Sequence, residues 1–259
     1  MLSQVIDIAK EAGELIKRIY LSEAYKFEHK ADQSLLTIAD TQADDLIVSA
    51  LTDQFDEFVI SEENYRSDDL APDDEEPYWL VDPLDGTKNF VERKDTFAVS
   101  IARMVGGKPQ LGVIYAPMFD EMYSAELGSG AFLNGVKIFN SRVSEPLVAI
   151  ASGSQVTERG KLFYEKFDVS DVIRIGSAIK FGWLASGRAD LYPRFGETSE
   201  WDIAAGHIIF SEAGGKIVSM ETGREMEYGK PGLRNRGFLA SRSNLNLESE
   251  MMKILSLPT

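Results

Sequence analysis

Residues 79–90, which read WLVDPLDGTKNF, constrain the fold more than any other part of this chain. The apolar run at residues 78–81 predicts a buried strand, and two aspartates follow it almost at once. Pro83 presets φ for a turn and Gly86 accepts a positive φ, so we expect the chain to bend sharply after Val81. A buried strand therefore ends in a stiff turn that carries two carboxylates.

Asp82 and Asp85 have a structural explanation as turn residues, but their spacing also suits a cation site. They lie three positions apart, whereas an EF-hand calcium loop has acidic residues at alternate positions. The spacing also differs from the Asp-x-Asp of phosphatases that form an aspartyl phosphate. With Pro83 stiffening the turn, both carboxylates and the Leu84 carbonyl can converge on one point, which would make a hard-cation site of oxygen ligands.

Further carboxylates occur where other rigid elements are expected to begin or end. Glu62 and Glu63 follow the strand-like residues 58–60, and Asp202 follows Trp201 at an expected helix start. Asp40 lies near the start of the second expected helix. Each has a structural alternative, because Asp40 can cap its helix and the Ser-x-x-Asp pattern that ends at Asp202 has the spacing of a capping box.

The motifs that are missing exclude several chemistries. The chain has no cysteine, which removes disulfides, thiolate metal sites and cysteine nucleophiles. Phosphate-loop, dinucleotide and GxSxG patterns are also missing. His29 and His207 are too few and too far apart for a histidine-based zinc site. A catalytic metal would therefore have oxygen ligands, which favours Mg²⁺, Mn²⁺ or Ca²⁺.

The formal net charge of −15 argues against a nucleic-acid or anionic-membrane partner. It would also repel an anionic ligand unless something at the site reverses the field. A bound divalent metal would reverse the field locally. The acidic segment at residues 66–76 is interpreted as a solvated loop, with a lid as the alternative. No apolar stretch reaches the roughly 20 residues of a membrane span, and the helical N-terminus carries charges throughout. A cytoplasmic protein is expected; peripheral contact with the inner membrane and the oligomeric state stay open.

The order of elements predicts an α+β fold with mixed and antiparallel sheets. Helical periodicity marks residues 5–19 and the segment from Asp40 to Leu51. Strands follow as a meander at residues 78–81, 97–104, 111–117 and 121–126, and strands then alternate with helices from residue 147, ending in a terminal helix. We expect one compact catalytic unit over residues 1–259, with a metal-site half at 1–145 and a substrate-contributing half at 146–259.

Three segments together resemble the signatures of the inositol monophosphatase superfamily, which are Mg²⁺-dependent, lithium-sensitive phosphatases. These segments are SEEN at residues 61–64, WLVDPLDGTKNF at 79–90 and EWDIAAGHIIFSEAGG at 200–215. The resemblance implies the layered α-β-α-β-α sandwich of the sugar phosphatases. A metal-binding protein without turnover is the alternative, but it would predict a broken set of these residues.

Within the superfamily, the chain is most similar to the bacterial 3′(2′),5′-bisphosphate nucleotidase branch. The stretches concerned are KADQSLLTIAD at residues 30–40, IGSAIKF at 175–181 and ADLYPRFG at 189–196. This resemblance implies removal of the 3′-phosphate of adenosine 3′,5′-bisphosphate, giving AMP, in sulfate assimilation. Asn89 is more typical of the inositol type, so an inositol or sugar monophosphate is the alternative substrate.

The resemblance also implies roles for individual residues. It implies two or three Mg²⁺ ions whose ligands are Glu62, Asp82, the Leu84 carbonyl, Asp85 and Asp202. Thr87, hydrogen-bonded to Asp40, would orient and help deprotonate the attacking water. The phosphate would meet the N–H groups of Gly86 and Thr87. The second phosphate and the nucleotide are assigned to Ser177, Lys180 and Arg194, of which Lys180 is expected on a helix that starts at Ser177. Glu63 and Lys30 are secondary candidates near the metals.

Overall fold

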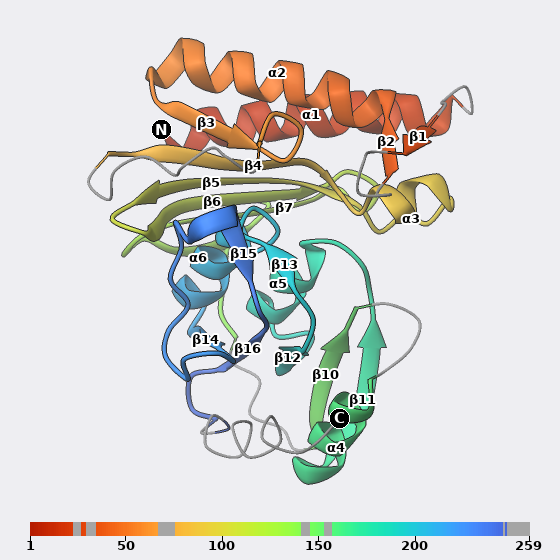
Figure 1. Ribbon diagram of the computed structural model, residues 1–259, viewed down its shortest axis with the longest axis vertical. Helices are drawn as coiled ribbons and strands as arrows, with labels where there is room; N and C mark the ends of the chain where they lie inside the picture. Colours follow the sequence, from red (N-terminus) through yellow and green to blue (C-terminus); the bar gives the residue numbers. More distant parts are fainter. Residues whose placement is uncertain are drawn as a thin grey trace.

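The computed structural model describes residues 1–22, 27–29, 35–66, 76–140, 146–152, 157–245 and 247. Two long helices, α1 (Leu2–Leu21) and α2 (Ile38–Phe55), lie side by side and form the outer layer of the molecule (Figure 1). The apolar residues of α1 recur every three to four positions, and this stripe is buried. Helix α2 begins after Thr37, which forms a reciprocal capping box with Asp40.

A seven-stranded sheet lies beneath these helices, in the order β3-β4-β5-β6-β7-β8-β9. Only β3 and β4 are parallel; every other neighbouring pair is antiparallel. The expected meander is therefore confirmed. The strands are β3 (Phe58–Ser61), β4 (Tyr78–Asp85), β5 (Ala98–Val105), β6 (Lys108–Ala116), β7 (Glu121–Glu126), β8 (Gly130–Leu133) and β9 (Val136–Ile138).

Strand β4 is buried on both faces, and its side chains divide between two apolar clusters. Trp79 and Val81 pack with α1 and α2, whereas Tyr78 and Leu80 belong to the cluster on the opposite face. A continuous apolar run of this kind is required for a strand covered by helices on both sides.

The opposite face of the sheet is covered by α5 (Ile179–Ala185) and α6 (Ala204–Glu212). Beyond these helices lies a five-stranded sheet in the order β11-β10-β12-β16-β14, and α4 (Glu158–Lys166) forms the last layer (Figure 1). Its strands are β10 (Leu147–Ala151), β11 (Val169–Arg174), β12 (Leu191–Arg194), β14 (Gly215–Ser219) and β16 (Phe238–Arg242). The α-β-α-β-α order of layers is confirmed.

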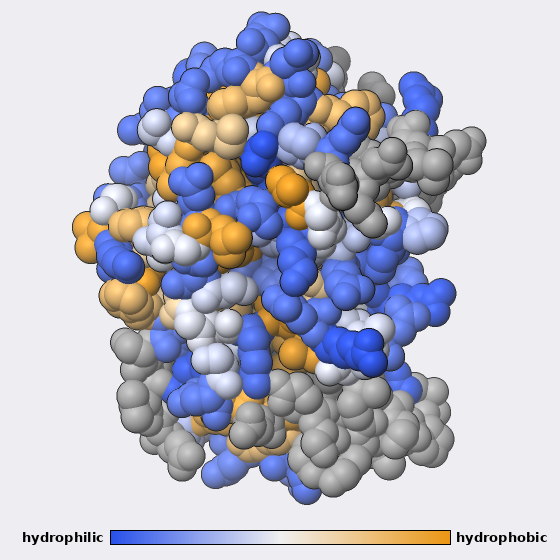
Figure 2. Space-filling view, turned by 90° about the vertical axis from the view of Figure 1, so that its left-hand side faces the viewer, coloured by the Kyte–Doolittle hydropathy of each residue, from blue (hydrophilic) through white to orange (hydrophobic). Residues whose placement is uncertain are grey.

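Smaller elements complete the described part of the chain. They are a two-stranded sheet of β1 (Phe27–His29) and β2 (Leu35–Thr37), a second one of β13 (Thr198–Ser199) and β15 (Arg234–Asn235), the short helix α3 (Thr87–Val91) and the 3-10 turn η1 (Pro231–Leu233). Among the described residues, no helix combines the length and apolar character needed to cross a bilayer. Figure 2 shows hydrophilic residues spread over one face, with apolar residues between them in separate groups.

Several element boundaries differ from the sequence prediction. Strand β4 does not end at Val81 but continues through a bulge to Asp85, and the sharp reversal falls at Gly86. Helix α2 starts two residues before Asp40, and α6 starts at Ala204 instead of Trp201. The expected terminal helix and most of the acidic segment lie outside the described residues. The division near residues 140–146 and the cytoplasmic location stay predictions.

Candidate metal centre and active site

The end of β3 brings Glu62 beside Asp82. Strands β3 and β4 run parallel with Ser61 opposite Val81, and the Glu62 N–H donates to the Val81 carbonyl at 3.0 Å. Glu62 and Asp82 each follow one member of that pair, so the ladder places two carboxylates next to each other at one edge of the sheet.

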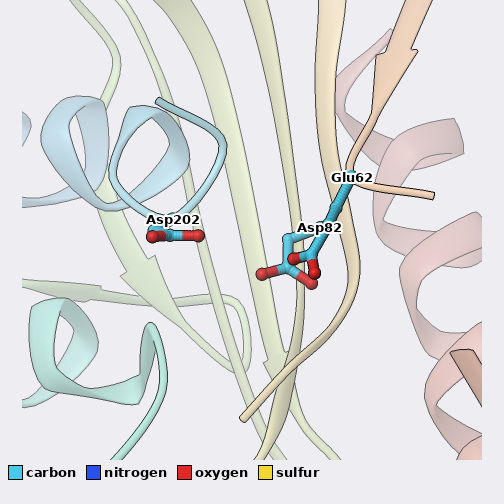
Figure 3. A group of neighbouring side chains, drawn as sticks. All are labelled: Glu62, Asp82 and Asp202. Carbon is cyan, nitrogen blue, oxygen red and sulfur yellow. The ribbon is translucent and has the colours of Figure 1, made fainter. Parts of the chain in front are cut away.

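Asp202 reaches the same point from the turn before α6. Its Oδ2 accepts a hydrogen bond of 2.9 Å from the Ser199 N–H, which is one half of the capping box that the sequence suggested. The hydroxyl of Ser100 on β5 donates to the Trp201 carbonyl at 3.3 Å and ties this turn to the sheet. Figure 3 shows Glu62 and Asp82 together, with Asp202 facing them from the α6 side.

These three carboxylates form a group that could hold a metal ion. Each of Glu62, Asp82 and Asp202 offers one oxygen, and the three oxygens all lie within 4.8 Å of one another. Burial raises the pKa of Asp82 well above its usual value, and the neighbouring carboxylates, Glu62 first, raise it further. Burial and the charges of Asp85 and Glu62 likewise raise the pKa of Asp202 to about 8. Such crowding of like charges, one buried and two half-buried, is relieved by a cation, so the residues present fit a divalent metal.

The β4 bulge directs the carboxylates of the turn at residues 82–87, which we call the catalytic turn because it carries the candidate catalytic residue Thr87. Asp82 pairs with Ser100 and Asp85 with Ala98, so β4 has one more residue than its partner across this interval. The Leu84 N–H donates to Asp82 Oδ1 at 3.1 Å, which fixes the carboxylate on its own turn. Gly86 follows with a φ of 97°, where a Cβ would lie 3.0 Å from the Thr96 carbonyl oxygen. Glycine is therefore required at this reversal.

Asp85 lies outside the group of three but interacts with it. Burial raises its pKa, and Glu62 adds to the rise. The charges of Lys180 and Arg194 and a backbone hydrogen bond from Ala178 act in the opposite direction. Asp85 therefore connects the acidic cluster to the cationic residues of α5 and β12.

Thr87 and Asp40 are in direct contact, as expected. The Thr87 hydroxyl lies 2.9 Å from Asp40 Oδ1 and 3.1 Å from the Leu84 carbonyl oxygen. A hydroxyl has one proton to donate, and a bond to a carboxylate is the stronger of the two. Donation to Asp40 leaves the lone pairs of the Leu84 carbonyl to a cation.

Thr37 is a site residue that the sequence analysis missed. Its backbone N–H donates to Asp40 Oδ2 at 2.7 Å, and its hydroxyl donates to the same oxygen. These bonds hold Asp40, which is 1% exposed, with Oδ1 facing Thr87. The Thr-x-x-Asp pattern at residues 37–40 is a capping-box signature and could have revealed this contact.

Ser177 and Lys180 lie against the catalytic turn, although not as predicted. Ser177 is not helical: it has a φ of 58°, and α5 begins two residues later. Its Cβ lies 3.2 Å from where a Gly86 side chain would begin. Lys180 is buried, with Nζ 5.6 Å from the centre of the Tyr192 ring. Ser177 therefore contacts the turn from just before α5, and Lys180 of α5 interacts with it through the charge of Asp85.

Arg194 lies further along the same side. Its guanidinium donates to the Ser152 hydroxyl and, at 3.2 Å, to the Glu197 carbonyl. A cavity of about 160 Å³ beside it is lined by Tyr164 and Phe195 among others. A second cavity of about 440 Å³ lies between α3 and the end of β11 and is lined by cationic residues among others, which are Lys88, Lys94 and Arg174.

The two secondary candidates contribute less to this picture. Glu63 follows Glu62, but its side chain is not part of the group of three carboxylates; its backbone N–H donates to the Ser61 hydroxyl at 3.1 Å. Lys30 lies outside the described residues.

Comparison with known proteins confirms the resemblance. Residues 1–255 match the profile of the inositol monophosphatase family. The 3′(2′),5′-bisphosphate nucleotidase CysQ of Escherichia coli (strain K12) is 38% identical over 246 residues, which cover 93% of this chain and 99% of that protein. Inositol monophosphatase 1 of Solanum lycopersicum is 37% identical over 229 residues, covering 83% of each chain.

A solved structure shows the same fold across nearly the whole length. CysQ from Bacteroides thetaiotaomicron, a bacterial member of the inositol monophosphatase family, has a TM-score of 0.83 and 33% identity, covering 94% of this chain and 97% of that chain. Since the family profile and these relatives match from end to end, this chain belongs to the inositol monophosphatase family, whose enzymes are metal-dependent.

Proposed function

We propose that this protein is a Mg²⁺-dependent phosphomonoesterase that removes the 3′-phosphate of adenosine 3′,5′-bisphosphate, giving AMP and phosphate. The observation that carries the proposal is the convergence of Glu62, Asp82 and Asp202 within 4.8 Å, at the turn where Thr87 meets Asp40. The similarity to bisphosphate nucleotidases over 93% of the chain supports this substrate class.

The metal ligands in this proposal are all oxygens. Glu62, Asp82, Asp202, Asp85 and the Leu84 carbonyl would hold two or three Mg²⁺ ions, which prefer hard oxygen donors. When bound, these ions supply Lewis-acid chemistry, which lowers the pKa of water and neutralises charge on the phosphate and on the leaving oxygen.

Thr87 and Asp40 handle the proton of the attacking water. Asp40 Oδ2 accepts two hydrogen bonds from Thr37. These bonds prevent rotation of the carboxylate and keep its Oδ1 directed at Thr87. With its own proton donated to Asp40, the Thr87 hydroxyl presents a lone pair and accepts a hydrogen bond from the water. This orients the water and helps to remove its proton as the new P–O bond forms. The N–H groups of Gly86 and Thr87 are assigned to the phosphate oxygens.

Ser177, Lys180 and Arg194 are assigned to the second phosphate and the nucleoside. Support comes from the position of Ser177 and Lys180 against the catalytic turn and from the charge of Arg194, which reaches Asp85. The aromatic rings beside Arg194 offer a surface on which a base can stack. The larger basic cavity between α3 and β11 is the alternative position for the second phosphate.

Hydrolysis of an inositol or sugar monophosphate at the same metal site is the second candidate. It is favoured by Asn89, which is typical of the inositol type, and by the similarity to the tomato inositol monophosphatase. A bisphosphate requires cationic side chains away from the metals to bind its second phosphate, whereas a monophosphate requires fewer such side chains.

Phosphate release should be compared for adenosine 3′,5′-bisphosphate, inositol 1-phosphate and fructose 1,6-bisphosphate, with Mg²⁺ and with added Li⁺. We expect the highest kcat/KM for the nucleotide, with inhibition by Li⁺. Equal or faster turnover of inositol 1-phosphate would refute the nucleotidase assignment. Arg194→Ala and Arg174→Ala then distinguish the two positions of the second phosphate, because only the correct one should raise KM for the bisphosphate.

A further inference from the structure

We infer that Asp44 positions the metal ligand Glu62 through the hydroxyl of Ser61, and that this contact sets the affinity of the acidic cluster for divalent cations. The inference rests on the proposed function only in taking Glu62 as a metal ligand. Asp44 is therefore a positioning residue and does not touch the metal or the substrate.

Helix α2 contacts two parts of the site from one of its faces. Asp40 and Asp44 are four residues apart, which places their side chains one helical turn from each other on the same face. Asp40 accepts from Thr87 on the catalytic turn, and Asp44 Oδ1 accepts from the hydroxyl of Ser61 at the end of β3. One rigid helix thus holds both the residue proposed to orient water and the turn that carries Glu62.

The hydroxyl of Ser61 is central to this turn. Ser61 is 0% exposed, so its hydroxyl depends on protein partners. It donates its proton to Asp44, which leaves a lone pair that accepts from the Glu63 N–H at 3.1 Å. The Ser61 carbonyl accepts from the Tyr65 N–H at 2.9 Å, and the Ser61 N–H donates to Asn64 Oδ1 at 2.8 Å. By accepting this proton, Asp44 holds the Ser61 hydroxyl in the orientation that accepts from the Glu63 N–H. Hydrogen bonds then hold the backbone on both sides of Glu62.

Glu62 needs such support because its neighbours repel it. One of its carboxylate oxygens lies within 4.8 Å of an oxygen of Asp82 and of an oxygen of Asp202. Without a cation, this repulsion favours displacement of the turn that carries Glu62 away from the cluster. The backbone bond to Val81 on one side and the Ser61–Glu63 bond on the other oppose that movement.

Manganese binding to the metal-free, full-length protein tests the inference without substrate. Outer partners of metal ligands typically affect affinity about 10- to 100-fold, so we expect the Mn²⁺ Kd, measured by electron paramagnetic resonance, to rise by about that factor in Asp44→Ala and in Ser61→Ala. The double variant should bind no more weakly than the weaker single variant, because both changes break one contact. Asp44→Asn keeps an acceptor oxygen and should recover affinity to within about fivefold of wild type.

Asp45 provides a matched control. It is the next residue of α2 but is exposed, so Asp45→Ala removes the same charge without touching Ser61. Its Kd should stay within about twofold of wild type, since an exposed charge is screened by salt. Thermal unfolding of each metal-free variant checks the fold, and Ser61→Ala carries the test if Asp44→Ala does not fold.

Three results would overturn the inference: an unchanged Kd in Ser61→Ala, additive effects in the double variant, or equal weakening in Asp44→Ala and Asp45→Ala, which would indicate bulk charge alone. A wild-type protein that binds no Mn²⁺ would overturn it together with the metal centre. If wild type binds Mn²⁺ and the variants weaken as expected but no nucleotide is hydrolysed, the positioning role stands and the proposed function fails.

Discussion

Replacing Thr87 by valine is the sharpest test of the proposed proton pathway. The substitution removes one hydroxyl and adds a methyl group of similar volume, so the turn keeps its packing. It deletes the contacts of 2.9 Å with Asp40 Oδ1 and 3.1 Å with the Leu84 carbonyl oxygen. A positioned general base contributes about 10²- to 10⁴-fold to the rate, so we expect kcat to fall by about that factor.

The effects on stability and on metal binding should be much smaller than the effect on rate. A hydrogen bond to a charged group is worth about 1.5–3 kcal/mol, and in a chain of this size about 1 kcal/mol corresponds to about 2–4 °C. The melting temperature should therefore fall by about 3–12 °C. The Mn²⁺ Kd should change by much less than kcat, because the hydroxyl is not itself a metal ligand and its proton goes to Asp40 instead of the Leu84 carbonyl.

Steady-state kinetics at saturating Mg²⁺ and substrate, with melting curves and Mn²⁺ binding, measure all three quantities. Thr87→Ser keeps the hydroxyl and should retain activity within about tenfold. Asp40→Asn should lower kcat to a similar extent, and the Thr87→Val/Asp40→Asn double variant should lose little more, since the two residues act as one unit. A Thr87→Val enzyme with kcat within about fivefold of wild type would refute the role. So would a loss of rate that is matched by a loss of metal binding.

Three further outcomes follow from the site. Asp85→Asn should reduce kcat by at least about 100-fold, while the melting temperature stays at or above that of wild type, since the change removes a half-buried carboxylate whose pKa desolvation raises. Exposed Asp53→Asn is the control, and near-normal turnover of Asp85→Asn would remove Asp85 from the ligand set. The metal-free protein should lose stability as pH rises from about 4 to about 8, because the pKa of Asp202 is raised from 3.8 to about 8 in the folded state. Denaturation at pH 5, 7 and 9 should show that the stabilisation by Mg²⁺ grows over this range. A metal-free stability that does not change with pH would contradict this. Gly176→Ala should destabilise the protein by about 1–3 kcal/mol in urea denaturation, because the new Cβ would lie 1.9 Å from Asn89 Nδ2. Adding Asn89→Ala to the same chain should restore part of this stability, and no recovery would rule out the clash.

The proximity of Glu62 and Asp82 could be predicted from the sequence because both follow strand-like runs. A strand-like run followed by a carboxylate occurs twice, at Glu62 and at Asp82, and parallel pairing of the two strands brings such residues together. The periodicity of the helices and the meander of strands also predicted an α+β fold, whose α-β-α-β-α order of layers the family resemblance implied. These features repeat over several residues, so a shift of one or two positions at an element boundary does not change them.

Features that depend on a single backbone conformation or on packing between distant elements were not predictable. The bulge in β4 adds one residue against β5, and nothing in the run YWLVDPLD distinguishes it from a turn after Val81. Ser177 adopts a positive φ that a serine rarely has, so a helix was expected to start there. The Asp44–Ser61 contact depends on the rotation of α2 about its own axis relative to β3, which the helical pattern of α2 does not determine.

The arrangement of the site explains how an acidic protein can bind an anion. Asp82 is buried and Asp202 half-buried beside Glu62 and Asp85, so the folded state holds them against both desolvation and mutual repulsion. Bonds from the backbone and from uncharged side chains, at Leu84, Ser199, Thr37 and Ser61, keep the carboxylates in place without neutralising them. Neutralisation is left to a cation, which is then attractive to phosphate. The crowding of the carboxylates, and not the bonds that hold them, raises the energy of the metal-free protein and makes the centre attract a divalent ion. Variants that remove one of the crowded charges, such as Asp85→Asn, should therefore not destabilise the metal-free fold while they weaken metal binding.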